Sequence, residues 1–132
     1  MGQFRLGHNL IDADPARATG LLEQACDGLE ALVAREPQRS GFVINFAFAS
    51  TRLATCYDNA GDSESTIETL DRALRVLERC ILGLETNEVG ITDMARRTFG
   101  GVIEWHASRG RPDLAAEAQR RLAVIEAHVQ GL

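Results

Sequence analysis

Residues 63–85 read SESTIETLDRALRVLERCILGLE, and this stretch decides the fold class. Its apolar residues recur at intervals of three and four positions, namely Ile67, Leu70, Leu74, Leu77, Ile81 and Leu84. Positions three and four apart lie on one face of an α-helix, so the spacing predicts an amphipathic helix over 63–85. Asp62 and Ser63 are candidate N-terminal caps, and Gly61 is suited to the left-handed end of a preceding helix.

The same period recurs along the rest of the chain. It predicts helices over 15–35, 40–60, 88–109 and 112–130, and a short one over 3–13. The pair Asp14-Pro15 is a cap followed by a proline in the first helical turn, and Asn87 is a candidate cap for the helix over 88–109. No segment alternates with the period of two that a strand requires. The sequence therefore predicts an all-α protein.

Composition excludes several classes of protein. Of the 132 residues 45% are hydrophobic and 25% are charged, a composition too apolar for a disordered chain. The length predicts one domain over 1–132. No apolar run approaches the roughly 20 residues of a membrane helix, and the N-terminus lacks a signal peptide. The net charge of −5 argues against nucleic acid as a partner. We expect a cytoplasmic protein with neither a nucleic-acid nor a membrane partner.

The residues that usually carry chemistry are scattered. Three cysteines fall on apolar stripes without a CxxC pair, and three histidines fall on different predicted helices: Cys26, Cys56, Cys80, His8, His106 and His128. A zinc site needs such residues at close, regular spacing, and buried cysteines usually act as small apolar residues. We therefore expect free thiols, no metal, no cofactor and no catalytic activity.

A repeat is visible in the turns between helices. The turns at 13–15, 60–62 and 109–111 lie 47 and 49 residues apart. Leu53-Ala54-Thr55-Cys56-Tyr57, Gly61 and Ala73-Leu74 have the spacing of a tetratricopeptide helix pair, with similar copies around Thr98–Ala115 and, clipped, Phe4–Pro15. The chain resembles the tetratricopeptide repeat family, most closely its longer-period variety found in kinesin light chain.

The resemblance implies an architecture and a function. Three helix pairs, over 3–36, 40–86 and 88–130, would stack as a short right-handed superhelix and serve as a non-catalytic scaffold or adaptor in a bacterial cytoplasm. The partner would be a protein or peptide. A stack with an uncovered end would form a homodimer or belong to a larger chain. An ordinary antiparallel helical bundle also fits the apolar stripes.

In stacked helical hairpins the first helix of each pair lines a concave groove. The polar or small residues beside the apolar stripes of those helices are therefore candidate contacts for a peptide or helix: Asn45, Phe48, Arg52, Thr55, Asn59, Arg97, Gly101 and Glu104. Arg52 and Arg97 facing one groove would clamp a carboxylate, which favours an acidic partner. Alternatively, each makes an ordinary surface ion pair.

Two other features leave alternatives open. Gly100 and Gly101 stand in the middle of a predicted helix, where they cost about 2 kcal/mol relative to two alanines. Tight packing of a neighbouring helix is the favoured explanation, and close approach of a ligand is the other. A second function, a small-ligand or regulatory sensor, would place His106, Trp105 and Arg97 around a pocket.

Overall fold

The computed structural model describes residues 14–132, so the predicted helix over 3–13 lies outside the described residues. Five helices are present: α2 (Pro15–Arg35), α3 (Ser40–Asn59), α4 (Ser63–Leu82), α5 (Val89–Ser108) and α6 (Pro112–Gln130). The described part of the chain contains no strand. The prediction of an all-α protein is confirmed, and each helix end lies within three residues of its predicted position.

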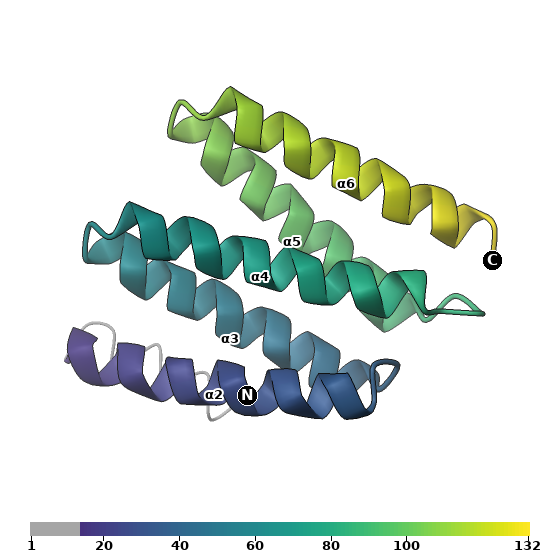
Figure 1. Ribbon diagram of the computed structural model, residues 1–132, viewed down its shortest axis with the longest axis horizontal. Coiled ribbons are helices and arrows are strands. Elements are labelled where there is room, and N and C mark those ends of the chain that lie inside the picture. The colour runs from purple at the N-terminus through teal and green to yellow at the C-terminus, as the bar shows by residue number, and fades with distance from the viewer. Residues whose placement is uncertain (1–13) are drawn as a thin grey trace.

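Short turns make consecutive helices antiparallel where they pair (Figure 1). The helix α3 packs against α2 and α4, and α5 packs against α6. The pair α3–α4 contacts the pair α5–α6 in three ways: α4 packs against α5, α3 also contacts α5, and α4 also contacts α6. This arrangement puts α3 beside α5 on one side of the molecule and α4 beside α6 on the other (Figure 1).

The core follows the apolar stripes. Phe46 of α3, Leu77 of α4 and Phe99 of α5 are fully buried in one cluster that extends to Ile125 of α6. A smaller cluster, centred on Cys26, joins α2 to α3. All three cysteines are buried and free, as the sequence predicted. Because each helix buries a full stripe, burial of apolar surface is the main force that holds the pairs together.

Polar caps and glycines set several helix ends as predicted. The carboxylate of Asp14 accepts a hydrogen bond from the Arg17 backbone N–H at 3.1 Å, and that of Asp62 accepts one from Ser65 at 3.0 Å. Gly61 has a φ of +77°, in the left-handed region that favours glycine. Its position just after α3 lets the chain turn sharply into α4.

Two predicted boundaries are wrong. The cap of α5 is Glu88, whose side chain accepts from the Gly90 backbone N–H at 3.1 Å; the Asn87 side chain instead accepts from the Thr92 hydroxyl at 2.9 Å. The helix α4 ends at Leu82 rather than at residue 85. Leu84 is nevertheless buried, because the chain turns back after Leu82 and returns this side chain to the core.

Arginines join helices that are distant in sequence. Arg72 of α4 binds Asp27 and Glu30 of α2, at 2.8 and 2.5 Å. Arg121 of α6 binds Asp71 of α4 at 2.8 Å and also Glu78. The Arg121 guanidinium is only 20% exposed, and charge-assisted hydrogen bonds of this kind are stronger in such surroundings than on an open surface. These ion pairs therefore join α4 both to α2 and to α6.

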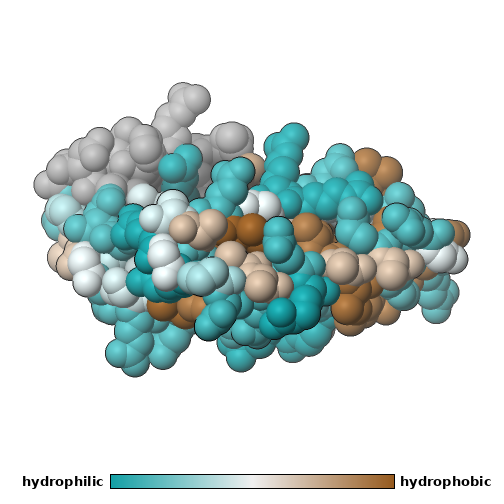
Figure 2. All heavy atoms as spheres, turned by 90° about the horizontal axis from the view of Figure 1, so that it is seen from above, coloured by the Kyte–Doolittle hydropathy of each residue, from teal (hydrophilic) through white to brown (hydrophobic). Residues whose placement is uncertain are grey.

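The surface above α6 is partly apolar. Seen from that side, hydrophobic residues form a band along the middle of the face, between hydrophilic side chains (Figure 2). Val124 of α6 is 58% exposed and Leu132 after it is 41% exposed. The described residues leave both side chains open to solvent.

Candidate functional site

A hollow of about 240 Å³ lies between α3 and α5. The N-terminal half of α4 contributes to its wall. Its lining residues are Thr51, Ala54, Thr55, Asp58, Thr66, Leu70, Arg97, Thr98, Gly101, Val102 and Trp105. Six of the lining residues are small, namely Ala54, Gly101 and the four threonines.

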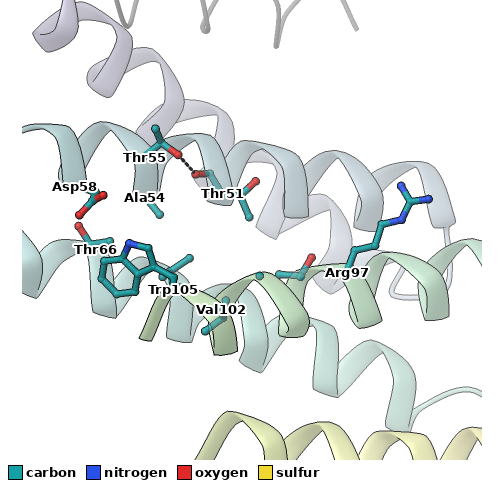
Figure 3. A pocket seen from close by; sticks show the side chains of 11 residues that line it. Thr51, Ala54, Thr55, Asp58, Thr66, Arg97, Val102 and Trp105 are labelled. Atoms are coloured by element: carbon teal, nitrogen blue, oxygen red, sulfur yellow. Dashed lines mark hydrogen bonds between the residues drawn. The ribbon is translucent and has the colours of Figure 1, made fainter. Parts of the chain in front are cut away.

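The wall of the hollow is mainly apolar. Ala54 of α3, Leu70 of α4 and Val102 of α5 are buried, and Trp105 is half-buried. Figure 3 shows the indole near Ala54 and Val102. Pockets that bind organic ligands or peptide side chains combine such a wall with a few polar groups that fix orientation. The polar groups here are four threonines, one aspartate and one arginine.

The threonine hydroxyls donate to their own helices. Thr55 donates to the Thr51 carbonyl at 3.0 Å, which Figure 3 shows as a dashed line, and Thr98 donates to the Met94 carbonyl at 2.8 Å. Thr51 and Thr66 do the same with carbonyls of the preceding turn. A hydroxyl whose hydrogen is used in this way keeps its lone pairs. The threonines therefore offer the hollow methyl groups and hydrogen-bond acceptors.

The two charged groups occupy different ends of the hollow (Figure 3). Asp58 lies near Trp105 and accepts a hydrogen bond from Arg109 at 2.7 Å, so its charge is largely compensated. Arg97 lies at the other end, is exposed, and makes no hydrogen bond or ion pair with the described residues. The hollow therefore has one cation whose hydrogen-bonding groups are available.

Contacts around Trp105 fix the wall of the hollow near Asp58. The guanidinium of Arg109 lies 5.3 Å from the centre of the indole ring and that of Arg111 lies 4.9 Å from it. The ring of His106 meets the indole edge-on, with centroids 5.1 Å apart. Cation–π contacts at a half-exposed site each contribute about 0.5–1 kcal/mol. Together they hold the indole in place without a bound partner.

Gly101 opens directly onto the hollow. Apart from the chain neighbours and the backbone of its own helix, a Cβ atom placed at Gly101 or at Gly100 would meet no described atom within 4 Å. The tight helix packing expected at this pair is therefore wrong within residues 14–132. Each glycine still weakens the helix by about 1 kcal/mol relative to alanine. Space on the hollow side, rather than a close helix contact, is what the missing side chain at Gly101 provides.

Three of the sequence-predicted contact residues meet at this hollow: Thr55, Arg97 and Gly101. The others lie elsewhere. Asn45 and Glu104 are exposed outside the lining, and Asn59 lines a separate hollow beside Pro15, Thr19 and Cys56.

Phe48 and Arg52 are half-buried, are not among the lining residues, and each has an interaction partner. The structure therefore does not bring Arg52 and Arg97 to one hollow. Of the two predicted guanidiniums, Arg97 alone lines it.

Sequence reasoning missed several lining residues: Thr51, Asp58, Thr66 and Thr98. Thr51, Thr55 and Asp58 follow one another at intervals of four and three, which marks one helix face. This face is adjacent to the predicted one, which ran through Arg52 and Asn59. Periodicity alone identified the correct helix, α3, but the face that it predicted is displaced by about one residue from the face that lines the hollow.

His106 points away from this hollow. It is 5% exposed and lines a different hollow of about 230 Å³ between α4 and α6, beside Leu74 and Arg121. Burial lowers the pKa of His106, and the nearby charge of Arg111 lowers it further. The set of His106, Trp105 and Arg97 that a sensor pocket would use is thus divided between two sides of α5.

Two kinds of site are absent from the described residues. Within residues 14–132, no three histidine, cysteine or carboxylate side chains gather in a way that could hold a metal ion. None of the five helices is both long enough and apolar enough to cross a lipid bilayer.

No protein-family model, curated protein or solved structure matches the chain. What the structure itself defines is an all-α protein whose helices α3 and α5 leave a mainly apolar hollow between them, with a few polar groups in its lining.

Proposed function

We propose that this chain is a non-catalytic protein-interaction module of the bacterial cytoplasm that binds a peptide or helix over the hollow between α3 and α5. In this proposal the pairs α3–α4 and α5–α6 are tetratricopeptide-like hairpins of a short right-handed stack, and α3 and α5 are the inner helices. The hollow carries the proposal, because Thr55, Arg97 and Gly101 line it and belong to the face that the sequence pattern assigned to a partner.

The polar groups of the hollow match those of a peptide. Backbone N–H groups need acceptors, and the oxygens of the exposed Thr55 and the half-buried Asp58 supply them. A carboxylate needs a charged donor, and the Arg97 guanidinium can donate two parallel hydrogen bonds to it. Since the protein carries a net charge of −5, one carboxylate placed at Arg97 is favoured over a strongly acidic segment.

A catalytic role has little support in these residues. A hydroxyl nucleophile requires a base that removes its proton. The threonine hydroxyls of the hollow donate instead to carbonyl groups of their own helices, as in the contact from Thr98 to Met94. They are therefore positioned to accept hydrogen bonds from a bound chain.

Selection of peptides from a random library tests this function. Peptides enriched on the wild-type chain would be synthesised and their affinities measured by fluorescence polarisation against Arg97→Glu and Arg120→Glu. Arg120 is an exposed cation of α6 that makes no ion pair with the described residues. Arg120→Glu is therefore the control, because it makes the same change of charge outside the lining of the hollow. Circular dichroism checks that both variants keep their helices.

We expect Arg97→Glu to weaken the selected peptides at least about tenfold, because a charge-assisted pair is replaced by repulsion. Arg120→Glu should leave their affinities within about twofold. Equal affinities for the wild type and Arg97→Glu would contradict the assignment of the hollow. Enrichment of no peptide, combined with stabilisation by a small organic molecule in a thermal-shift screen, would favour the sensor function instead.

A further inference from the structure

We infer that the hollow receives one large apolar side chain of the partner, and that Gly101 sets the upper limit on the size of that side chain. The inference rests on the proposed function, because it names what the bound peptide inserts. It assigns separate tasks to two lining residues of α5: Arg97 holds a carboxylate, and Gly101 leaves space for the apolar side chain.

The size of the hollow argues for a single side chain. Its volume of about 240 Å³ is below the roughly 300–1,000 Å³ of pockets that enclose a drug-sized ligand. A whole helix would have to lie across the opening instead of entering it. One side chain of leucine or phenylalanine size fits such a space while its backbone stays outside, near the exposed Thr55.

The chemistry of the wall argues for an apolar side chain. Ala54, Leu70 and Val102 present only hydrocarbon, and Trp105 presents an indole held by the two arginines stacked on it. The threonine hydroxyls have used their hydrogens within α3, α4 and α5. A polar side chain that accepts hydrogen bonds would find few donors deep in the hollow, and its burial there would be unfavourable.

Gly101 limits the occupant because it is the lining position with no side chain of its own. A residue there would add a side chain to the lining, and apart from its own helix backbone and chain neighbours no described atom lies within 4 Å of the missing Cβ. Gly100 offers a matched control. It is also a helical glycine with no described atom near its missing Cβ, yet it is not among the lining residues.

The test uses hexapeptides with the sequence acetyl-Gly-Ser-X-Glu-Gly-Ser-amide, in which X is Ala, Val, Leu or Phe. Trp105 is the one tryptophan of the chain and lines the hollow, so its fluorescence reports occupancy directly. Affinities would be measured for the wild type, Gly101→Ala, Gly101→Leu, Gly100→Ala, Gly100→Leu and Arg97→Glu. None of the peptides contains tryptophan or tyrosine, so the signal belongs to the protein.

The wild type should bind the Leu and Phe peptides at least about tenfold more tightly than the Ala peptide, because each buried methylene adds affinity. Gly101→Ala should weaken the Phe peptide most and the Ala peptide least, and Gly101→Leu should weaken the Phe and Leu peptides at least about tenfold. Both Gly100 variants should retain the wild-type order. Arg97→Glu should weaken all four peptides by a similar factor.

The inference and the proposed function fail in different ways. Binding that depends on Arg97 but is equal for all four peptides, or unchanged in Gly101→Leu, would overturn the inference and leave the proposed function standing. Absence of binding by every hexapeptide at millimolar concentration would overturn the inference, and failure of the library selection as well would overturn the proposed function.

Discussion

The helix α5 has a hollow on each of two sides, and the two differ in how their arginines are used. Between α4 and α6, Arg121 is enclosed by Glu78 and Asp71. Between α3 and α5, Arg97 has no charged partner among the described residues. The volumes, about 230 and 240 Å³, are nearly equal. Volume therefore does not separate the two hollows, whereas the charge partners of their arginines among the described residues do.

Removal of a core side chain from the α4–α6 side should have the largest effect on stability. Leu74 is 2% exposed and forms part of that wall. Leu74→Ala should lower the free energy of unfolding by about 2–5 kcal/mol, as truncation of a buried leucine usually does. Urea denaturation followed by circular dichroism measures this. A loss below about half a kcal/mol would show that α4 does not pack as described, and the comparison of the two sides would then fail.

Truncation of the two arginines sharpens the comparison directly. Arg121→Ala should cost about 1–2 kcal/mol, because it leaves the half-buried Glu78 and Asp71 without their shared partner. Arg97→Ala should change stability by less than about 0.5 kcal/mol, since it breaks no contact with the described residues. Equal losses for the two variants in parallel urea titrations would contradict the assignment of structural and binding roles.

The pH dependence of stability tests the buried position of His106. Because its pKa in the folded protein lies below the ordinary value of 6.5, the unfolded chain takes up the proton at a higher pH than the folded chain. Stability should therefore be complete above pH 6.5 and decrease as the pH falls from there through the lowered folded-state pKa.

The matched variant for that prediction is His106→Gln, which cannot titrate. Comparison of its urea midpoints with those of the wild type between pH 7 and 5 isolates the contribution of His106 from that of the carboxylates. The wild type should lose more stability than the variant over this range. Identical slopes would indicate that the His106 side chain is hydrated, not enclosed beside α4 and α6.

Alanine substitutions at Gly100 and Gly101 should have the smallest effect on stability, and only the substitution at Gly101 should change peptide binding. Gly100→Ala and Gly101→Ala should each raise the free energy of unfolding by about 0.5–1 kcal/mol, because alanine favours the helix and nothing described obstructs its Cβ. Thermal denaturation measures both. Destabilisation by either alanine would show that a neighbouring chain does approach that position.

Sequence patterns predicted the helices well because the apolar residues that mark a helix lie within that helix, three and four positions apart. The caps Asp14 and Asp62 were likewise predicted correctly, since a cap acts on residues three positions away. Asn87 was wrong because two adjacent polar residues compete for the same helix end, and the Thr92 hydroxyl engages Asn87 and leaves Glu88 as the cap. Such a choice depends on side-chain geometry that periodicity does not contain.

The candidate site was predicted only in part, for a different physical reason. The ion pairs that decide which arginines are available join residues far apart in the chain, such as Arg109 with Asp58 and Arg121 with Asp71. Composition counts 14 basic residues but says nothing about these pairings. Similarly, a glycine pair in a helix does not by itself show whether a neighbouring helix packs closely there or the space is open, and at Gly101 the space is open.

The central claim is that a partner peptide binds over the hollow between α3 and α5. Amide chemical-shift perturbation of the isotopically labelled wild-type chain, titrated with the tightest peptide from the library selection, tests it most directly. We predict that the largest shifts fall on Thr55, Arg97, Gly101 and the Trp105 indole N–H. Largest shifts on the α4–α6 side, around Leu74 and Arg121, would contradict the claim.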